Sequence, residues 1–234
     1  MTYTDINNDI SFITGTGTSE YEAADRVRNV NNWYLQVASW IFEADGRWQW
    51  DDANQTNMPS ATTNLVSDQK DYLILAASPS SGQDWLQIDR VEITDDNDEQ
   101  REIMPLDQTD LKGVALDEFM DTPQQPEYYD FRGNSIFLYP APNYNKSGGL
   151  TVYFKRSPLL FATTDTTKQP GFATPYHKIL SLGASYDWAV SKGDNNIDRI
   201  RQELEILKKG LKDFYSKRDK YEIPKLKRRY SSYK

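Results

Sequence analysis

Cysteine is absent from this sequence, and histidine occurs only once among its 234 residues. The lack of cysteine excludes disulfides, thiolate metal sites and cysteine nucleophiles. With His177 as the single imidazole, histidine-ligated metals and histidine-based proton relays have almost no donors. A run of about 18 apolar residues is also missing, which argues against a membrane-spanning helix. The first ten residues have neither a basic nor an apolar region of the kind found in secretory signals. Composition therefore argues against most classes of enzyme.

Charge is abundant but unevenly distributed. The chain carries 27 Lys and Arg against 35 Asp and Glu, a net charge of −8. Residues 195–234 hold 13 basic and 6 acidic residues, a net of +7, so residues 1–194 hold 14 against 29, a net of −15. Such a division predicts a basic interaction tail on an acidic body, and that body would repel nucleic-acid phosphates.

Helical periodicity marks three segments. The first follows Ser19 and Glu22, whose spacing fits a capping box, and its apolar residues recur at steps of 3, 4, 3, 4, 3 from Val27 to Ala44. A second helix is expected after Thr174-Pro175 and should end at Gly193. The third repeats the same steps from Ile197 to Phe214. These matched apolar seams predict that the three helices pack together.

The middle of the chain changes to a period of two, which is typical of strands. The predicted strands are 71–75, 85–93, 101–106, 128–131, 135–140 and 150–156. Asp95–Asp98 and Gly133-Asn134 separate neighbouring strands and suit hairpin turns. Residues 109–120 are predicted to form a short helix that covers an edge or a face of the sheet. Most links are too short for crossover helices, so an antiparallel meander is expected.

The predicted fold class is therefore α+β. It consists of an antiparallel helical bundle, made of the N-terminal helix and two C-terminal helices, with an inserted antiparallel β-rich region and an extended C-terminal tail. The predicted boundaries are 1–18 for a flexible N-terminal arm, 19–50 and 170–221 for the bundle, 51–169 for the β-rich region, and 222–234 for the basic tail.

Candidate chemical sites are few. The acidic turn Asp95–Glu99 lacks the spacing and the glycine of a calcium loop, so a solvated hairpin turn is expected there. Asp117, Glu118 and Asp121 could mimic the carboxylate pair of a glycosidase, but among 35 acidic residues such proximity is expected by chance. His177 is expected to lie at a surface or an interface. The sequence therefore predicts a protein that is not an enzyme, with no catalytic residues, no metal site and no cofactor.

Two stretches, FRGNSIFLYPAPN (131–143) and GLTVYFKRSP (149–158), resemble the head-to-tail connector (adaptor) proteins of short-tailed bacteriophages. The resemblance extends to the strand patterns at 64–75 and 88–93 and to the helix that begins with PYHKIL at Pro175. It implies a structural protein of the virion neck that forms a ring, commonly of twelve subunits, beneath the portal. Such a ring extends the DNA channel, helps to retain the packaged genome and supports the tail nozzle and fibres. The implied partners are further copies of the chain, the portal, the nozzle and fibre proteins, and double-stranded DNA that passes without sequence recognition; no membrane is involved.

The C-terminal tail is the predicted portal-binding segment. Pro224 prevents continuation of the preceding helix, and cations alternate with a few apolar anchors. The residues predicted to bind the portal are Lys225, Leu226, Lys227, Arg228, Arg229, Tyr230 and Tyr233. Alone, such a segment buries too little apolar area to offset its loss of conformational entropy, so folding on binding is expected.

Two alternatives to the adaptor interpretation remain open. One is a virion-associated peptidoglycan or polysaccharide hydrolase, which requires two carboxylates in a cleft. The other is a carbohydrate-binding β module that uses exposed aromatic residues such as Trp85.

Overall fold

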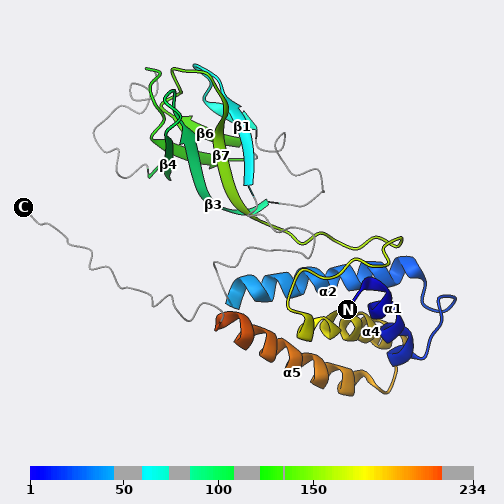
Figure 1. Cartoon of the computed structure of the whole chain (residues 1–234). Coiled ribbons are helices and arrows are strands. Elements are labelled where there is room, and N and C mark those ends of the chain that lie inside the picture. The colour runs from blue at the N-terminus through cyan, green and yellow to red at the C-terminus, as the bar shows by residue number, and fades with distance from the viewer. Residues whose placement is uncertain (45–59, 74–84, 108–121, 134, 218–234) are drawn as a thin grey trace, which may run out of the picture. The chain divides into compact units, whose positions relative to one another are not determined.

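A computed structural model of the protein describes residues 1–44, 60–73, 85–107, 122–133 and 135–217. The chain divides into two compact units, residues 1–48 together with 161–234, and residues 49–160. The α-helices that the structure describes belong to the first, here called the helical unit, and the strands belong to the second, the β unit (Figure 1).

The helical unit is built around one central helix. Its elements are α1 (Tyr3–Thr14), α2 (Ala23–Ala44), the 3₁₀ turn η2 (Thr174–Tyr176), α4 (Lys178–Lys192) and α5 (Ile197–Ser216). The helices α1, α2 and α5 each pack on α4, and α2 also packs on α5 (Figure 1). Residues 179–185 of α4 are consecutively buried, as expected for a helix that is surrounded on most sides. Gly193 ends α4 in the left-handed conformation, as the sequence predicts.

Helix α1 lies in the stretch that the sequence suggested to be an arm. Thr2 and Asp5 form a capping box, in which the Asp5 N–H donates to Thr2 Oγ1 at 3.2 Å and the Thr2 N–H donates to Asp5 Oδ2 at 2.8 Å. Tyr3, Ile6 and Ile10 are buried and lie on one face of the helix. By contrast, α2 begins at Ala23 rather than at the predicted Ser19–Glu22 box.

The apolar faces of α2 and α5 largely follow the predicted steps. Val30, Tyr34, Val37 and Ile41 are buried on α2, and Ile200, Leu204 and Leu211 on α5. At the end of α5, however, Tyr215 is buried and Phe214 is 46% exposed. The Tyr215 hydroxyl accepts a hydrogen bond from the Ala173 N–H at 2.9 Å, so a distant backbone group selects which aromatic ring turns inward.

The α5 seam leads to a stability prediction. We expect Leu211→Ala to lower the free energy of unfolding of the helical unit by about 2–5 kcal/mol, because Leu211 is fully buried and truncation leaves a cavity. The matched change Ile206→Ala, at a side chain that is 71% exposed on the same helix, should cost less than about 0.5 kcal/mol. Chemical denaturation followed by helical circular dichroism measures both, and equal small losses would contradict the packing of α5.

The described residues of the β unit form a seven-stranded sheet. Its strands are β1 (Ser60–Leu65), β2 (Asp71–Leu73), β3 (Trp85–Thr94), β4 (Gln100–Pro105), β5 (Tyr128–Arg132), β6 (Ser135–Tyr139) and β7 (Lys146–Arg156). They are arranged in the order β1-β7-β3-β4-β5-β6-β2. Two predicted hairpins are confirmed, since β3 pairs with β4 around the 95–98 turn and β5 pairs with β6 around Gly133, both antiparallel.

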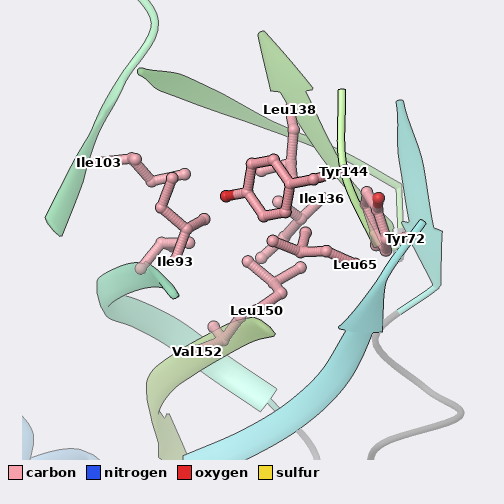
Figure 2. Close-up of a cluster of buried hydrophobic side chains, with 10 residues drawn as sticks. Leu65, Tyr72, Ile93, Ile103, Ile136, Leu138, Tyr144, Leu150 and Val152 are labelled. Atoms are coloured by element: carbon pink, nitrogen blue, oxygen red, sulfur yellow. The ribbon is translucent and has the colours of Figure 1, made fainter. Parts of the chain in front are cut away.

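The sheet curls toward a closed barrel. Its two edge strands, β1 and β2, follow one another in the chain, and the Val66 N–H donates to the Tyr72 hydroxyl at 3.1 Å across the link between them. The interior is filled by a cluster of buried side chains from strands around the sheet and from the 140–145 segment (Figure 2). The cluster comprises Leu65, Tyr72, Val91, Ile93, Ile103, Ile136, Leu138, Tyr144, Leu150 and Val152.

The predicted architecture of the α+β fold is wrong. The described chain is a mixed α+β fold with four α-helices and a nearly closed, barrel-like sheet of seven strands, rather than a three-helix bundle with an inserted antiparallel region. Strands β4 and β5 pair in parallel, Met104 with Tyr128 and Pro105 with Tyr129, so the sheet is not a simple meander. A parallel pair requires a long connection, and the sequence between Pro105 and Tyr128 is long enough for one, but strand periodicity alone does not reveal the pairing.

Candidate interaction surfaces

A hollow lined by aromatic side chains lies between α2 and α5 of the helical unit. Trp33 and Trp40 from α2 meet edge to face with ring centroids 6.2 Å apart, and Tyr186 from α4 contacts Trp33 in the same manner at 6.4 Å. The Lys208 ammonium lies 4.7 Å from the centre of the Trp40 ring, a cation–π contact. The hollow has a volume of about 260 Å³ and is also lined by Arg201 and Glu205. Both tryptophans therefore contribute to the surface of the helical unit, in addition to packing within it.

A second hollow, of about 320 Å³, is polar and lies beside Asp187 on α4. The Trp33 indole N–H donates to Asp187 Oδ2 at 2.9 Å. Burial raises the pKa of the Asp187 carboxyl, and this hydrogen bond opposes the shift. The Tyr21 hydroxyl donates to the Ala184 carbonyl at 3.1 Å and accepts from the Asn29 amide at 2.7 Å at the same hollow. The contacts serve to position α2 against α4.

His177, expected at a surface or an interface, is instead buried, with 1% of its area exposed. Its Nε2 lies 2.8 Å from the Phe172 carbonyl, which can only accept, so Nε2 carries the proton. Its Nδ1 lies 3.1 Å from the amino group of Met1 and accepts from it. Burial lowers the pKa of the His177 imidazole, and the positive charge of that amino group acts in the same direction. The imidazole is therefore a neutral structural group and leaves no nitrogen free for proton transfer.

The buried imidazole predicts a pH dependence of stability. Because the folded-state pKa lies below the ordinary value of about 6.5, the unfolded chain binds the proton more readily, and stability falls as pH drops below that value. The variant His177→Gln keeps an N–H donor but has no group that titrates near neutral pH. The wild type should therefore lose its stability advantage over this variant as the pH falls from about 7 to about 5. One proton limits the slope to about 1.4 kcal/mol per pH unit. A difference that stays constant over this range would contradict a neutral, buried His177.

The acidic turn after β3 is a structural turn. Asp95 Oδ1 accepts from the backbone N–H groups of Asn97 and Glu99 at 2.8 and 2.9 Å, and Lys146 pairs with Asp98 at 2.6 Å. Within the described ranges, no group of three or more His, Asp or Glu side chains could hold a metal ion. Close to this turn, burial raises the pKa of Tyr144 in the barrel interior to about 12, with the charges of the turn adding to the effect.

The other candidate sites fall outside the described residues. These are the acidic residues Asp117, Glu118 and Asp121, the helix expected at 109–120, and the predicted portal-binding residues at 225–230 and 233. No helix in the part of the chain that the structure describes is long and apolar enough to cross a membrane.

A comparison with known protein families shows to which family the chain belongs. The model of the SU10 adaptor protein family matches residues 1–220, which span both units. The chain belongs to the SU10 adaptor protein family. This membership confirms the resemblance to phage head-to-tail adaptors and identifies a structural adaptor protein of a bacteriophage. It implies a place in the virion neck and association with portal and tail components. A search of curated proteins finds no match.

The sequence analysis also missed a buried arginine, Arg26, that anchors the helical unit. Arg26 lies on the buried face of α2 with Val30 and Tyr34, although the predicted face began at Val27, and it is 2% exposed. The signal in the sequence was its position four residues before Val30, because residues four apart share one face of a helix.

Proposed function

We propose that this adaptor forms a ring, of twelve copies, beneath the portal at the head-to-tail junction. The ring extends the DNA channel, helps to retain the packaged genome and carries the tail nozzle and fibres. The observation that carries this proposal is the family match over residues 1–220.

The distribution of charge supports the passage of DNA without binding. Residues 1–194 hold 29 acidic and 14 basic residues. Binding of a protein to duplex DNA is driven by cations that replace the counterions on the phosphates. An acidic ring offers few such cations, so packaged DNA can slide past it.

Exposed apolar side chains on the helical unit support a ring of copies. Phe12, Leu35, Val190 and Ile206 are exposed on α1, α2, α4 and α5 respectively, the first by 89% of its area. Contacts between subunits of a ring would cover such side chains where they fall in the interface.

Ring formation is tested with the purified full-length chain, alone and with the portal. Negative-stain images and native mass spectrometry should show rings in the presence of the portal, and their stoichiometry follows from the mass. Monomers at every concentration, with and without the portal, would contradict the proposal.

The C-terminal tail is proposed to be the segment that binds the portal. We expect truncation after Tyr221 to leave the folded units intact but to weaken portal binding at least tenfold, because four cations between Lys225 and Arg229 and the rings of Tyr230 and Tyr233 are lost. Raising the salt concentration should weaken binding of the intact chain, since its charges are screened.

The matched control is the full chain with Lys192→Glu and Lys217→Glu, which changes cations outside the tail. This variant should bind the portal as the wild type does. Undiminished binding of the truncated chain, measured by surface plasmon resonance, would show that the tail is not the connecting segment.

A further inference from the structure

Phe12 on α1 is more exposed than any other large apolar side chain among the described residues, with 89% of its area open to solvent. Ile6 and Ile10 belong to the buried face of α1. Because Ile10 and Phe12 are two residues apart on a helix that turns by about 100° per residue, their side chains point to opposite sides. The Phe12 ring therefore contributes little to the packing of its own subunit.

The hollow between α2 and α5, called here the aromatic hollow, can hold one further aromatic ring. Its volume is about 260 Å³, and a cavity of about 150 Å³ is already large enough to bind benzene. The rings of Trp33, Trp40 and Tyr186 line it. Aromatic rings prefer edge-to-face or offset arrangements with centroids about 4.5–7 Å apart, and these three rings already adopt that spacing. A fourth ring would gain the same contacts and exclude water from both tryptophans.

The Phe12 ring and the aromatic hollow lie on different sides of the helical unit. Ser181 of α4 faces α1, since its hydroxyl donates to Asp9 Oδ2 at 3.5 Å. Tyr186, which lines the hollow, follows five residues later and points about 140° away around the axis of α4. Phe12 points away from α4, so it cannot enter the hollow of its own subunit but can enter that of another copy. Contacts between two different surfaces of identical subunits generate a ring when the rotation closes.

The charges on the two surfaces are complementary. Helix α1 carries Asp5 and Asp9 but no Lys or Arg, and the spacing of 4 and 3 residues places both on the same face as Phe12. Residues 199–212 of α5, which form one wall of the hollow, hold five Lys and Arg against two Glu, a net of +3. Complementary charges steer association and fix its register. The outward face of α1 is therefore attracted to the α5 wall of a second copy.

We propose that Phe12 of one subunit inserts into the aromatic hollow of the next copy of this chain, and that this contact repeats around the adaptor ring. The occupant of the hollow is thus α1 of a second copy, with its aspartates beside Arg201 and Lys208. The inference rests on the proposed ring and specifies which surfaces of its subunits meet.

Cross-linking between introduced cysteines tests the contact directly, because the natural chain contains no cysteine. Asn8→Cys lies one turn before Phe12, and Gln36→Cys lies at the hollow; both positions are exposed. Full-length chains that carry one change each are mixed, assembled with the portal and treated with a short bismaleimide. We expect cross-linked dimers at a yield at least tenfold higher than in either variant alone. In the matched control, Ile206→Cys, exposed on α5 outside the hollow, replaces Gln36→Cys and should give no such increase.

Removal of the Phe12 ring tests whether the contact is needed for assembly. Phe12→Ser should lower the yield of rings at least tenfold in native mass spectrometry. Its helical circular dichroism and its unfolding midpoint should match those of the wild type, because the side chain is exposed in the single subunit. Ile206→Ser makes the same kind of change at a side chain that is 71% exposed outside the hollow, and it should assemble as the wild type does.

The outcomes separate this inference from the proposed ring. Cross-links between two Asn8→Cys chains, in place of the mixed pair, would show a two-fold contact through α1. Rings of unchanged yield in Phe12→Ser would show that its ring is not part of the interface. Either result with intact wild-type rings overturns this inference alone, whereas wild-type monomers under every condition overturn the proposed ring as well.

Discussion

Replacement of Arg26 by Met is expected to lower the free energy of unfolding of the helical unit by about 3–5 kcal/mol. Arg26 is buried, and all five of its guanidinium N–H groups donate hydrogen bonds. The acceptors are the carbonyls of Asn7, Thr16, Gly17 and Tyr21 and the hydroxyl of Ser11, at distances from 2.7 to 3.4 Å.

These bonds tie helix α1 and the following turn to α2. No basic residue lies in the last turn of α1, and Arg26 supplies a cation from the neighbouring helix near its negative end. Met has a similar length but leaves the acceptors buried without donors. Loss of amide protection in α1 should therefore accompany the loss of stability, and hydrogen exchange measures it.

Arg28→Met is the matched control for Arg26. Arg28 lies on the same helix, is 64% exposed and pairs with Asp25 at 2.8 Å. Surface ion pairs contribute little, so this change should cost less than about 1 kcal/mol. Similar losses in the two variants, measured by chemical denaturation, would contradict the anchoring role of Arg26.

Gly183→Ala is expected to destabilise the helical unit by about 1–3 kcal/mol, although alanine ordinarily favours a helix by up to about 1 kcal/mol over glycine. A Cβ atom at position 183 of α4 would overlap the indole ring of Trp33 on α2. Glycine therefore allows α2 and α4 to approach closely at this point. The approach also brings Trp33 to Asp187 and Tyr186.

A control glycine and a double-mutant cycle test this contact. Gly210→Ala, within α5, places its Cβ 3.2 Å from the ring edge of Tyr176, which lies in a short turn, and should change stability by less than about 1 kcal/mol. Adding Trp33→Leu to Gly183→Ala should cost less than the sum of the two single changes, because the smaller side chain removes the overlap. Additive losses in this double-mutant cycle, measured by thermal unfolding, would show that the two residues are not in contact.

Two elements, α1 and β1, were missed for different reasons. Tyr3, Ile6 and Ile10 have helical spacing, and Thr2 with Asp5 forms a capping box, but the polar residues between them suggested an arm. Strand β1 was hidden for another reason. Its sequence SATTNL has only two buried side chains, Ala61 and Leu65. The segment is identified as a strand mainly by its antiparallel hydrogen bonds to β7.

The sequence by itself determined the properties that depend on neighbouring residues and on composition. The seams of α2 and α5, the end of α4 at Gly193 and both confirmed hairpins follow from local periodicity and turn chemistry. The acidic body, the basic C-terminal end and the likeness to phage adaptors could also be read from the residues alone.

Only the tertiary structure decided which segments meet. Strand periodicity does not specify the partner of a strand, so the parallel pairing of β4 with β5 depends on contacts between segments distant in the chain. The same holds for burial of polar groups. His177 and Arg26 look like surface residues in the sequence, but each is buried where remote backbone carbonyls can accept its hydrogen bonds. Those acceptors come into place only when the helices pack, because burying such a group without partners would be unfavourable.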